Sequence, residues 1–140
     1  VFVAQSFKDS VWRLVEALAA KDIRDVSVIT GDIGADHRAE AVDAFQADRS
    51  RVLVGTVGAG GMSISLHRLS EDRRPRTSIL RPSYRADELT QALGRIYRAG
   101  MVGSVVQRIV LCAGTVEERV YRRLMAKCRN IQTLVDSDLA

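Results

Sequence analysis

The stretch that decides the fold is Arg51-Val52-Leu53-Val54-Gly55-Thr56-Val57-Gly58-Ala59-Gly60-Gly61. It starts as a short apolar run and ends in clustered glycines, as expected for a buried strand that leads directly into a loop. Similar runs occupy residues 1–4, 26–29, 77–80 and 105–111. Helix-length segments separate these runs, and the alternation predicts an α/β domain with a mainly parallel central sheet and helices on both faces.

The segments between the runs repeat apolar residues at helical spacing. A helix is predicted across residues 11–18, and Trp12, beside its apolar stripe, is expected in the core. Further helices are predicted at 35–47, from about residue 86 through Ile96, and at 116–128 with Thr115 as N-cap.

Length and composition fit one domain, because the chain has 140 residues of which 46% are hydrophobic. No apolar run approaches the ~20 residues that cross a bilayer, and no membrane partner is expected. The formal net charge of +4 favours anionic partners. Cys112 and Cys128 lack metal-ligand spacing, so no metal site and a reducing, intracellular compartment are expected. The chain opens directly in a strand-like run, which suggests a part of a longer protein.

A second informative stretch is Gln91-Ala92-Leu93-Gly94-Arg95-Ile96-Tyr97-Arg98-Ala99-Gly100. Its two arginines stand three residues apart, a spacing that places both guanidinium groups on one face of a helix. Such a pair suits a polyphosphate, because each group is permanently charged and can bind phosphate oxygens through two hydrogen bonds. The other interpretation is a surface pair neutralised by carboxylates such as Asp87 or Glu88.

With the glycine-rich stretch, this motif resembles the C-terminal RecA-like lobe of superfamily 2 helicases and translocases. The resemblance is closest to the chromatin-remodelling (Swi/Snf-like) DNA translocases, and it implies a three-layer α/β fold. Residues 58–66 are similar to the family's fifth motif, and the start of the helix at 114–121 resembles that of the remodelling branch. The family's sixth motif is matched by Gln91, Gly94, Arg95, Arg98 and Gly100.

The resemblance covers nearly the whole chain. It assigns residues 1–129 to the lobe and residues 130–140 to a tail or the start of a linker. Gly58, Met101 and the segment 81–84 depart from the remodelling pattern. A strawberry-notch-like or viral relative therefore fits equally well.

The resemblance implies an ATP site shared with another lobe. Arg98 would act as the arginine finger, Arg95 as a second phosphate contact, and Gln91 would couple the phosphate or the attacking water to closure. Gly60, Gly61 and Gly94 would bind the nucleotide with the two arginines. Thr56, Gly60 and Gly61 would link the nucleotide cleft to the nucleic-acid track, and Ser65, at an asparagine-like position, is a further candidate for that link. The chain has no phosphate loop and no acidic Mg²⁺-binding strand end. Mg²⁺ would therefore be held by an N-terminal RecA-like lobe of the same polypeptide, and the chain alone is expected to be inactive.

The resemblance also implies a nucleic-acid track made of Gln5, Ser6, Thr30, Gly31, Arg38 and Thr56. Its expected partner is the backbone of double-stranded DNA, read without sequence preference. Arginines between residues 68 and 85 form a basic region that is either a further nucleic-acid contact or a solvated face. Two alternatives stay open, an RNA helicase lobe and a non-catalytic binding or scaffolding module of the same fold.

Overall fold

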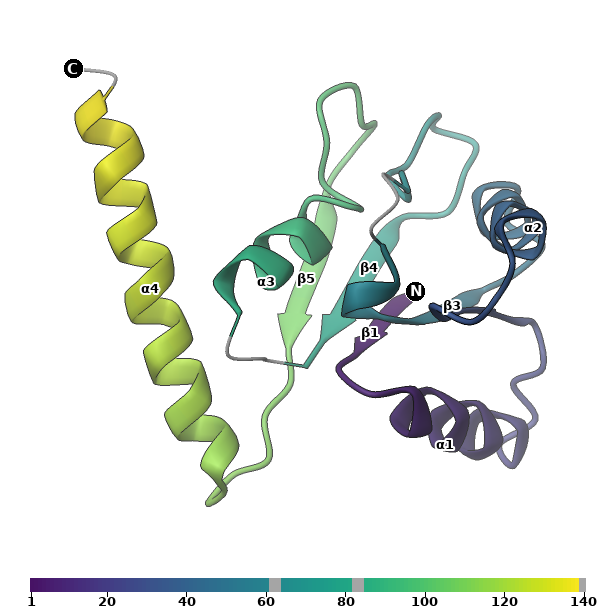
Figure 1. Cartoon of the computed structure of the whole chain (residues 1–140). Coiled ribbons are helices and arrows are strands. Elements are labelled where there is room, and N and C mark those ends of the chain that lie inside the picture. The colour runs from purple at the N-terminus through teal and green to yellow at the C-terminus, as the bar shows by residue number, and fades with distance from the viewer. Residues whose placement is uncertain (61–63, 82–84, 139–140) are drawn as a thin grey trace.

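The computed structural model describes residues 1–60, 64–81 and 85–138, and it contains one five-stranded sheet. The strands are β1 (Phe2–Gln5), β2 (Val26–Ile29), β3 (Val52–Thr56), β4 (Arg76–Leu80) and β5 (Val105–Ile109). Their order is β2-β3-β1-β4-β5, and every neighbouring pair is parallel. The predicted parallel sheet is confirmed (Figure 1).

In the described part of the chain, the strands are connected or followed by the helices α1 (Lys8–Ala19), α2 (Ala35–Gln46), α3 (Ala86–Leu93) and α4 (Val116–Asp138). A 3-10 turn, η1 (Val57–Gly60), follows β3. Within the described residues, no helix is both long enough and apolar enough to cross a membrane.

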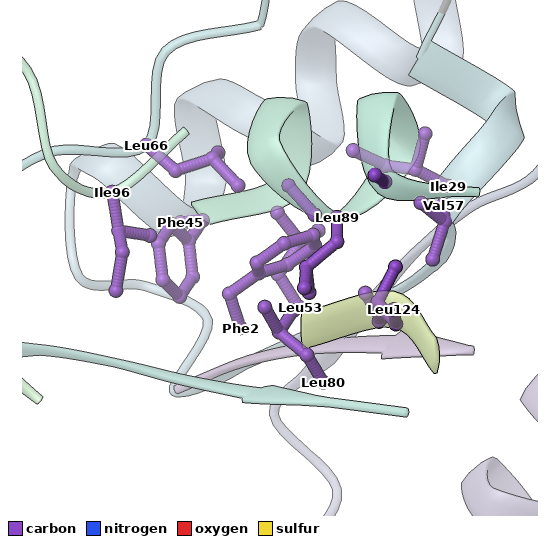
Figure 2. Close-up of a cluster of buried hydrophobic side chains, with 13 residues drawn as sticks. Phe2, Ile29, Phe45, Leu53, Val57, Leu66, Leu80, Leu89, Ile96 and Leu124 are labelled. Atoms are coloured by element: carbon purple, nitrogen blue, oxygen red, sulfur yellow. The ribbon is translucent and has the colours of Figure 1, made fainter. Parts of the chain in front are cut away.

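Side-chain alternation along β1 and β3 divides the core between the two faces of the sheet. Val3 and Val54 pack with Val11 of α1 on one face. The larger cluster, drawn in Figure 2, lies on the other face and combines sheet residues with residues of the three other helices. These include Phe2, Leu53, Phe45, Leu89 and Leu124. The three-layer α/β architecture is therefore present.

Gly55 shows why a glycine stands inside β3. It pairs with Ile29 of β2, and a Cβ atom at Gly55 would lie 2.9 Å from the Ile29 carbonyl oxygen. Because that neighbour is rigid backbone, a larger residue would push β2 and β3 apart.

Three local predictions differ from the structure. Trp12 is 46% exposed, so it is a surface residue of α1 and not part of the core. α3 ends at Leu93 although the apolar pattern continues to Ile96, and α4 continues to Asp138 rather than ending at Cys128. The start of α4 is as predicted, since the Thr115 hydroxyl accepts a hydrogen bond from the Glu117 N–H at 3.3 Å.

Candidate functional site

The carboxyl edge of the sheet gathers the six residues of the predicted nucleic-acid track. Gln5 ends β1 and pairs with Thr56, which ends β3, while Ile29 pairs with Gly55 and places Thr30 beside them. Ser6 and Gly31 follow directly in the sequence. Arg38 lies in the first turns of α2 at the same edge, and its Nε donates to the Ile33 carbonyl at 3.1 Å. The parallel topology therefore brings all six predicted residues to one edge.

Thr30 cannot contact a ligand through its side chain, because that side chain is fully buried. Its hydroxyl donates to Asp32 at 2.6 Å, and Lys8 pairs with the same carboxylate at 3.2 Å. The hydrogen bond from Thr30, assisted by Lys8, holds the pKa of Asp32 below its usual range. The Thr30 side chain therefore fixes the conformation of the β2–α2 loop through Asp32. Gly31, by contrast, is exposed, and a Cβ atom at this position would meet no other atom within 4 Å.

Two helix N-termini open onto this edge. α1 begins after Phe7 and α2 begins after Gly34, and among the described residues neither has a side-chain cap. Uncapped N–H groups and the positive end of the helix dipole attract anions such as phosphate. Asp9 and Asp36 in the first turns oppose this attraction, and Lys8 and Arg38 reinforce it.

The predicted arginine pair does not lie on a helix. Because α3 ends at Leu93, Arg95 and Arg98 stand in the turn that follows, and they differ in exposure. Arg95 is only 7% exposed, while Arg98 is on the surface. Burial, and then the nearby charge of Arg98, lower the pKa of Arg95 from its ordinary value. The prediction that both guanidinium groups leave one helix face is therefore wrong, although the two charges are close enough to interact.

The end of the segment 58–66, which follows β3, contacts this turn directly. The Leu66 N–H donates to the Arg95 carbonyl at 2.8 Å, and the Arg98 guanidinium donates to the Ser65 hydroxyl. Leu66 and Ile96 are both fully buried and lie near Phe45 (Figure 2). The two motifs singled out in the sequence are thus joined in space, although Gly61 lies outside the described residues.

The surroundings of Arg98 test the alternative that Asp87 or Glu88 neutralises the arginine pair at the surface. Asp87 and Glu88 both pair with Arg85, at 2.6 and 3.4 Å. In the part of the chain that the structure describes, no carboxylate lies within 4.0 Å of the Arg98 guanidinium. Gln91 is exposed on α3, one turn before the arginine pair.

Gly94 is the C-cap of α3 and has a right-handed conformation, with φ of −67°. A Cβ atom there would approach only helix carbonyls, the nearer at 3.4 Å. Packing within this chain therefore does not demand glycine at position 94, and the position is compatible with close approach of a ligand.

The two groups of candidate residues lie toward opposite edges of the sheet. α2 and α3 each return the chain from the carboxyl edge to the amino edge, so their C-terminal ends, and the arginine turn after α3, lie toward the amino edge. One segment connects the groups, because Thr56 belongs to the carboxyl edge and Ser65 contacts Arg98.

Sequence reasoning missed a buried charge at the start of β4. Arg76, counted above in the basic region, is only 3% exposed and pairs with Asp48 at 2.8 Å. Other members of that region also have partners within the chain, such as Arg81 with Glu117. The sequence does carry a signal for the burial of Arg76, because Arg76 alternates along β4 with Ser78 and Leu80, and all three side chains are buried.

Comparisons with known proteins indicate the family of the chain. A protein of Acanthamoeba polyphaga mimivirus, whose name places it among ATP-dependent RNA helicases, is 38% identical over 112 residues. That match covers 79% of this chain and 21% of the viral protein. The DNA excision repair protein ERCC-6-like of Bos taurus is 33% identical over 91 residues, covering 64% of this chain and 7% of that protein. The chain belongs with the C-terminal RecA-like lobes of superfamily 2 helicases and translocases.

A solved structure shares the fold of this lobe. The C-terminal part of the Fun30 ATPase domain superposes with a TM-score of 0.76 at 19% identity, covering 88% of this chain and 38% of that one. No family model matches the chain. The lobe therefore spans about a fifth of the viral relative and a smaller share of the repair protein.

Proposed function

We propose that this lobe is the second motor lobe of an ATP-dependent DNA helicase or translocase. It closes on an N-terminal RecA-like lobe of the same polypeptide over Mg-ATP, and Arg98 serves as the arginine finger. The observation that carries the proposal is the exposed Arg98 guanidinium, held by Ser65 and without a carboxylate within 4.0 Å among the described residues. Such a cation is available to a phosphate from outside the lobe.

The chemistry of phosphoryl transfer suits this arrangement, because catalysis there depends on placing positive charge around the transferred group. Arg95 acts as the second phosphate contact. Its pKa is lowered by burial and by Arg98, so an anion beside the two guanidinium groups would offset both unfavourable effects. Gln91 couples the phosphate or the attacking water to closure, while Gly60, Gly61 and Gly94 allow the backbone to approach the nucleotide.

A single lobe is expected to hydrolyse no ATP. The chain lacks a phosphate loop and an acidic Mg²⁺-binding strand end, so the nucleotide would have no complete site. The measurement is phosphate release by the purified chain with Mg-ATP, with and without DNA. Robust ATP turnover by residues 1–140 that disappears in Arg98→Ala would contradict the proposal that another lobe holds Mg-ATP while this lobe supplies the arginine finger.

Nucleic-acid binding is expected at the carboxyl edge and should be strongly salt-dependent. Phosphate contacts release counterions, so a loss of affinity of about tenfold or more between ~50 and ~200 mM salt is expected. Arg38→Ala should lower the salt slope by about one, and Arg38→Lys should restore it. Fluorescence anisotropy with duplex DNA, single-stranded DNA and RNA measures the affinities.

Arg49→Ala is the matched control, because Arg49 is exposed beyond the other end of α2 and should leave binding unchanged. A preference for RNA over duplex DNA would favour the RNA helicase alternative, which the name of the viral relative supports. Binding that is unaffected by salt would overturn the proposed backbone track.

A further inference from the structure

A hydrogen-bonded network connects the buried ion pair of the amino edge to Arg98. We call it the amino-edge network; it consists of Asp48, Arg76, Gln46, Ser65 and Arg98. Arg76 begins β4, and its guanidinium donates to Asp48 at 2.8 Å and to the Gln46 side-chain oxygen at 3.2 Å. The Gln46 side-chain nitrogen donates to the Ser65 carbonyl at 2.8 Å. The Ser65 hydroxyl in turn accepts from Arg98.

The buried end of this network is firmly fixed. Arg76 is 3% exposed, donates also to the Phe45 and Gln46 carbonyls at 3.4 Å, and lies 4.6 Å from the centre of the Phe45 ring. Asp48 accepts a second hydrogen bond, from the Arg74 N–H at 3.0 Å. A buried charge with this many partners has little freedom to move, so it provides a rigid anchor.

The planar amide of Gln46 makes two hydrogen bonds within the network: it donates one to Ser65 and accepts one from Arg76. Guanidinium groups only donate and a carbonyl only accepts, so the two partners fix the orientation of the Gln46 amide. Its nitrogen must face Ser65 and its oxygen must face Arg76. Gln46 therefore transmits the position of the buried pair to the backbone of Ser65.

Ser65 is the point at which the network meets the proposed phosphate site. Its neighbour Leu66 is fully buried and donates to the Arg95 carbonyl, so this short segment contacts both arginines. We propose that Gln46 is a positioning residue, which holds Ser65 so that Ser65 presents Arg98 at the surface. The catalytic consequence rests on the proposed function, whereas the positioning itself does not.

The discriminating variant is Gln46→Glu. It keeps the size of the side chain and an acceptor for Arg76, but it replaces the donor that faces the Ser65 carbonyl by a carboxylate oxygen. A variant that only damaged the fold would lower the melting temperature. Gln46→Glu is expected to leave the melting temperature unchanged, because its carboxylate strengthens the contact to Arg76. Asp43→Asn, at an exposed position of the same helix, is the matched control.

The first experiment uses the chain alone and measures the order of the Arg98 side chain by ¹⁵N relaxation of its Nε–H group. Gln46→Glu is expected to increase the mobility of Arg98 to the level seen in Ser65→Ala, with the melting temperature unchanged. Asp43→Asn should leave Arg98 as in the parent chain. An Arg98 that stays equally ordered in Gln46→Glu would overturn the positioning role, whatever the function of the lobe.

The second experiment uses a polypeptide that joins the chain to a lobe with a phosphate loop. Gln46→Glu is expected to lower kcat for ATP about tenfold with little change in KM, because a small displacement of a charge-placing group acts on the transition state. The double variant with Ser65→Ala should be no worse than either single one, since both act through Arg98. Unchanged kcat in a variant whose Arg98 is mobile would contradict the arginine-finger function and leave the positioning intact.

Discussion

Arg98→Ala is expected to lower kcat for ATP hydrolysis about 10³-fold when the chain is joined to a phosphate-loop lobe. The reason is that an arginine finger stabilises the charge that develops on the transferred phosphate. Among the described residues, no other exposed guanidinium donates to Ser65 and could replace Arg98 there. KM should change little, because the finger acts mainly in the transition state. Steady-state ATPase kinetics with saturating DNA measure both constants.

Two further variants make this result specific. Arg98→Lys keeps the charge but loses the planar fork, so it should recover only part of the lost rate. Arg85→Ala removes another exposed arginine, one that pairs with Asp87 within the chain, and should leave kcat close to that of the parent. An Arg98→Ala enzyme within about fivefold of the parent rate would mean that Arg98 is not the finger, since arginine fingers contribute far more.

The strands could be predicted because buried parallel strands appear as short apolar runs. The run 26–29 coincides with β2, and the other runs agree within a few residues. The order of the strands in the sheet could not be derived in this way, because the apolar runs do not specify which strands pair. The placement of Thr56 beside both Gln5 and Thr30 depends on that order.

α3 ends before the apolar pattern does, for a physical reason. Ile96 continues the apolar spacing of the helix, and it is indeed fully buried, but it reaches the core from the turn after Leu93. Periodicity reports which residues face the core and not whether the backbone between them is still helical. The different exposures of Arg95 and Arg98 follow from this turn, which the apolar periodicity does not predict.

The amino-edge network shows the limit of reading charge from sequence. Arg76 stands among other arginines, so the local sequence places it in a basic region. Its side chain alternates along β4 with those of Ser78 and Leu80, and all three are buried. Its partner Asp48 stands 28 residues earlier, and nothing in the local pattern links the two. Long-range polar pairs of this kind require the folded arrangement of α2 and β4.

Removal of the buried Arg76 charge is expected to have the second large effect. Arg76→Ala should lower the free energy of unfolding by about 3–5 kcal/mol, because it leaves Asp48 without its ion-pair partner and opens a cavity beside Phe45. Urea unfolding of the chain at neutral pH, followed by circular dichroism, measures the loss. A decrease below about 1 kcal/mol would be typical of a solvated surface pair and would contradict the buried one.

The carboxylate side of the same pair predicts how stability depends on pH. Burial alone would raise the pKa of Asp48, but hydrogen bonds from the Arg74 N–H and the Arg76 guanidinium outweigh it and hold this pKa below its ordinary value. A group whose pKa is lower in the folded state adds stability above its unfolded pKa, and that stability is lost as the pH falls through the folded pKa.

Asp48→Asn is the suitable variant, because Asp48 has a φ of 59°, a conformation that asparagine tolerates and alanine does not. It should be less stable than the parent at neutral pH and should lose less stability on acidification. Parallel acid-unfolding curves for the two proteins would show that the pair is not linked to proton binding at Asp48.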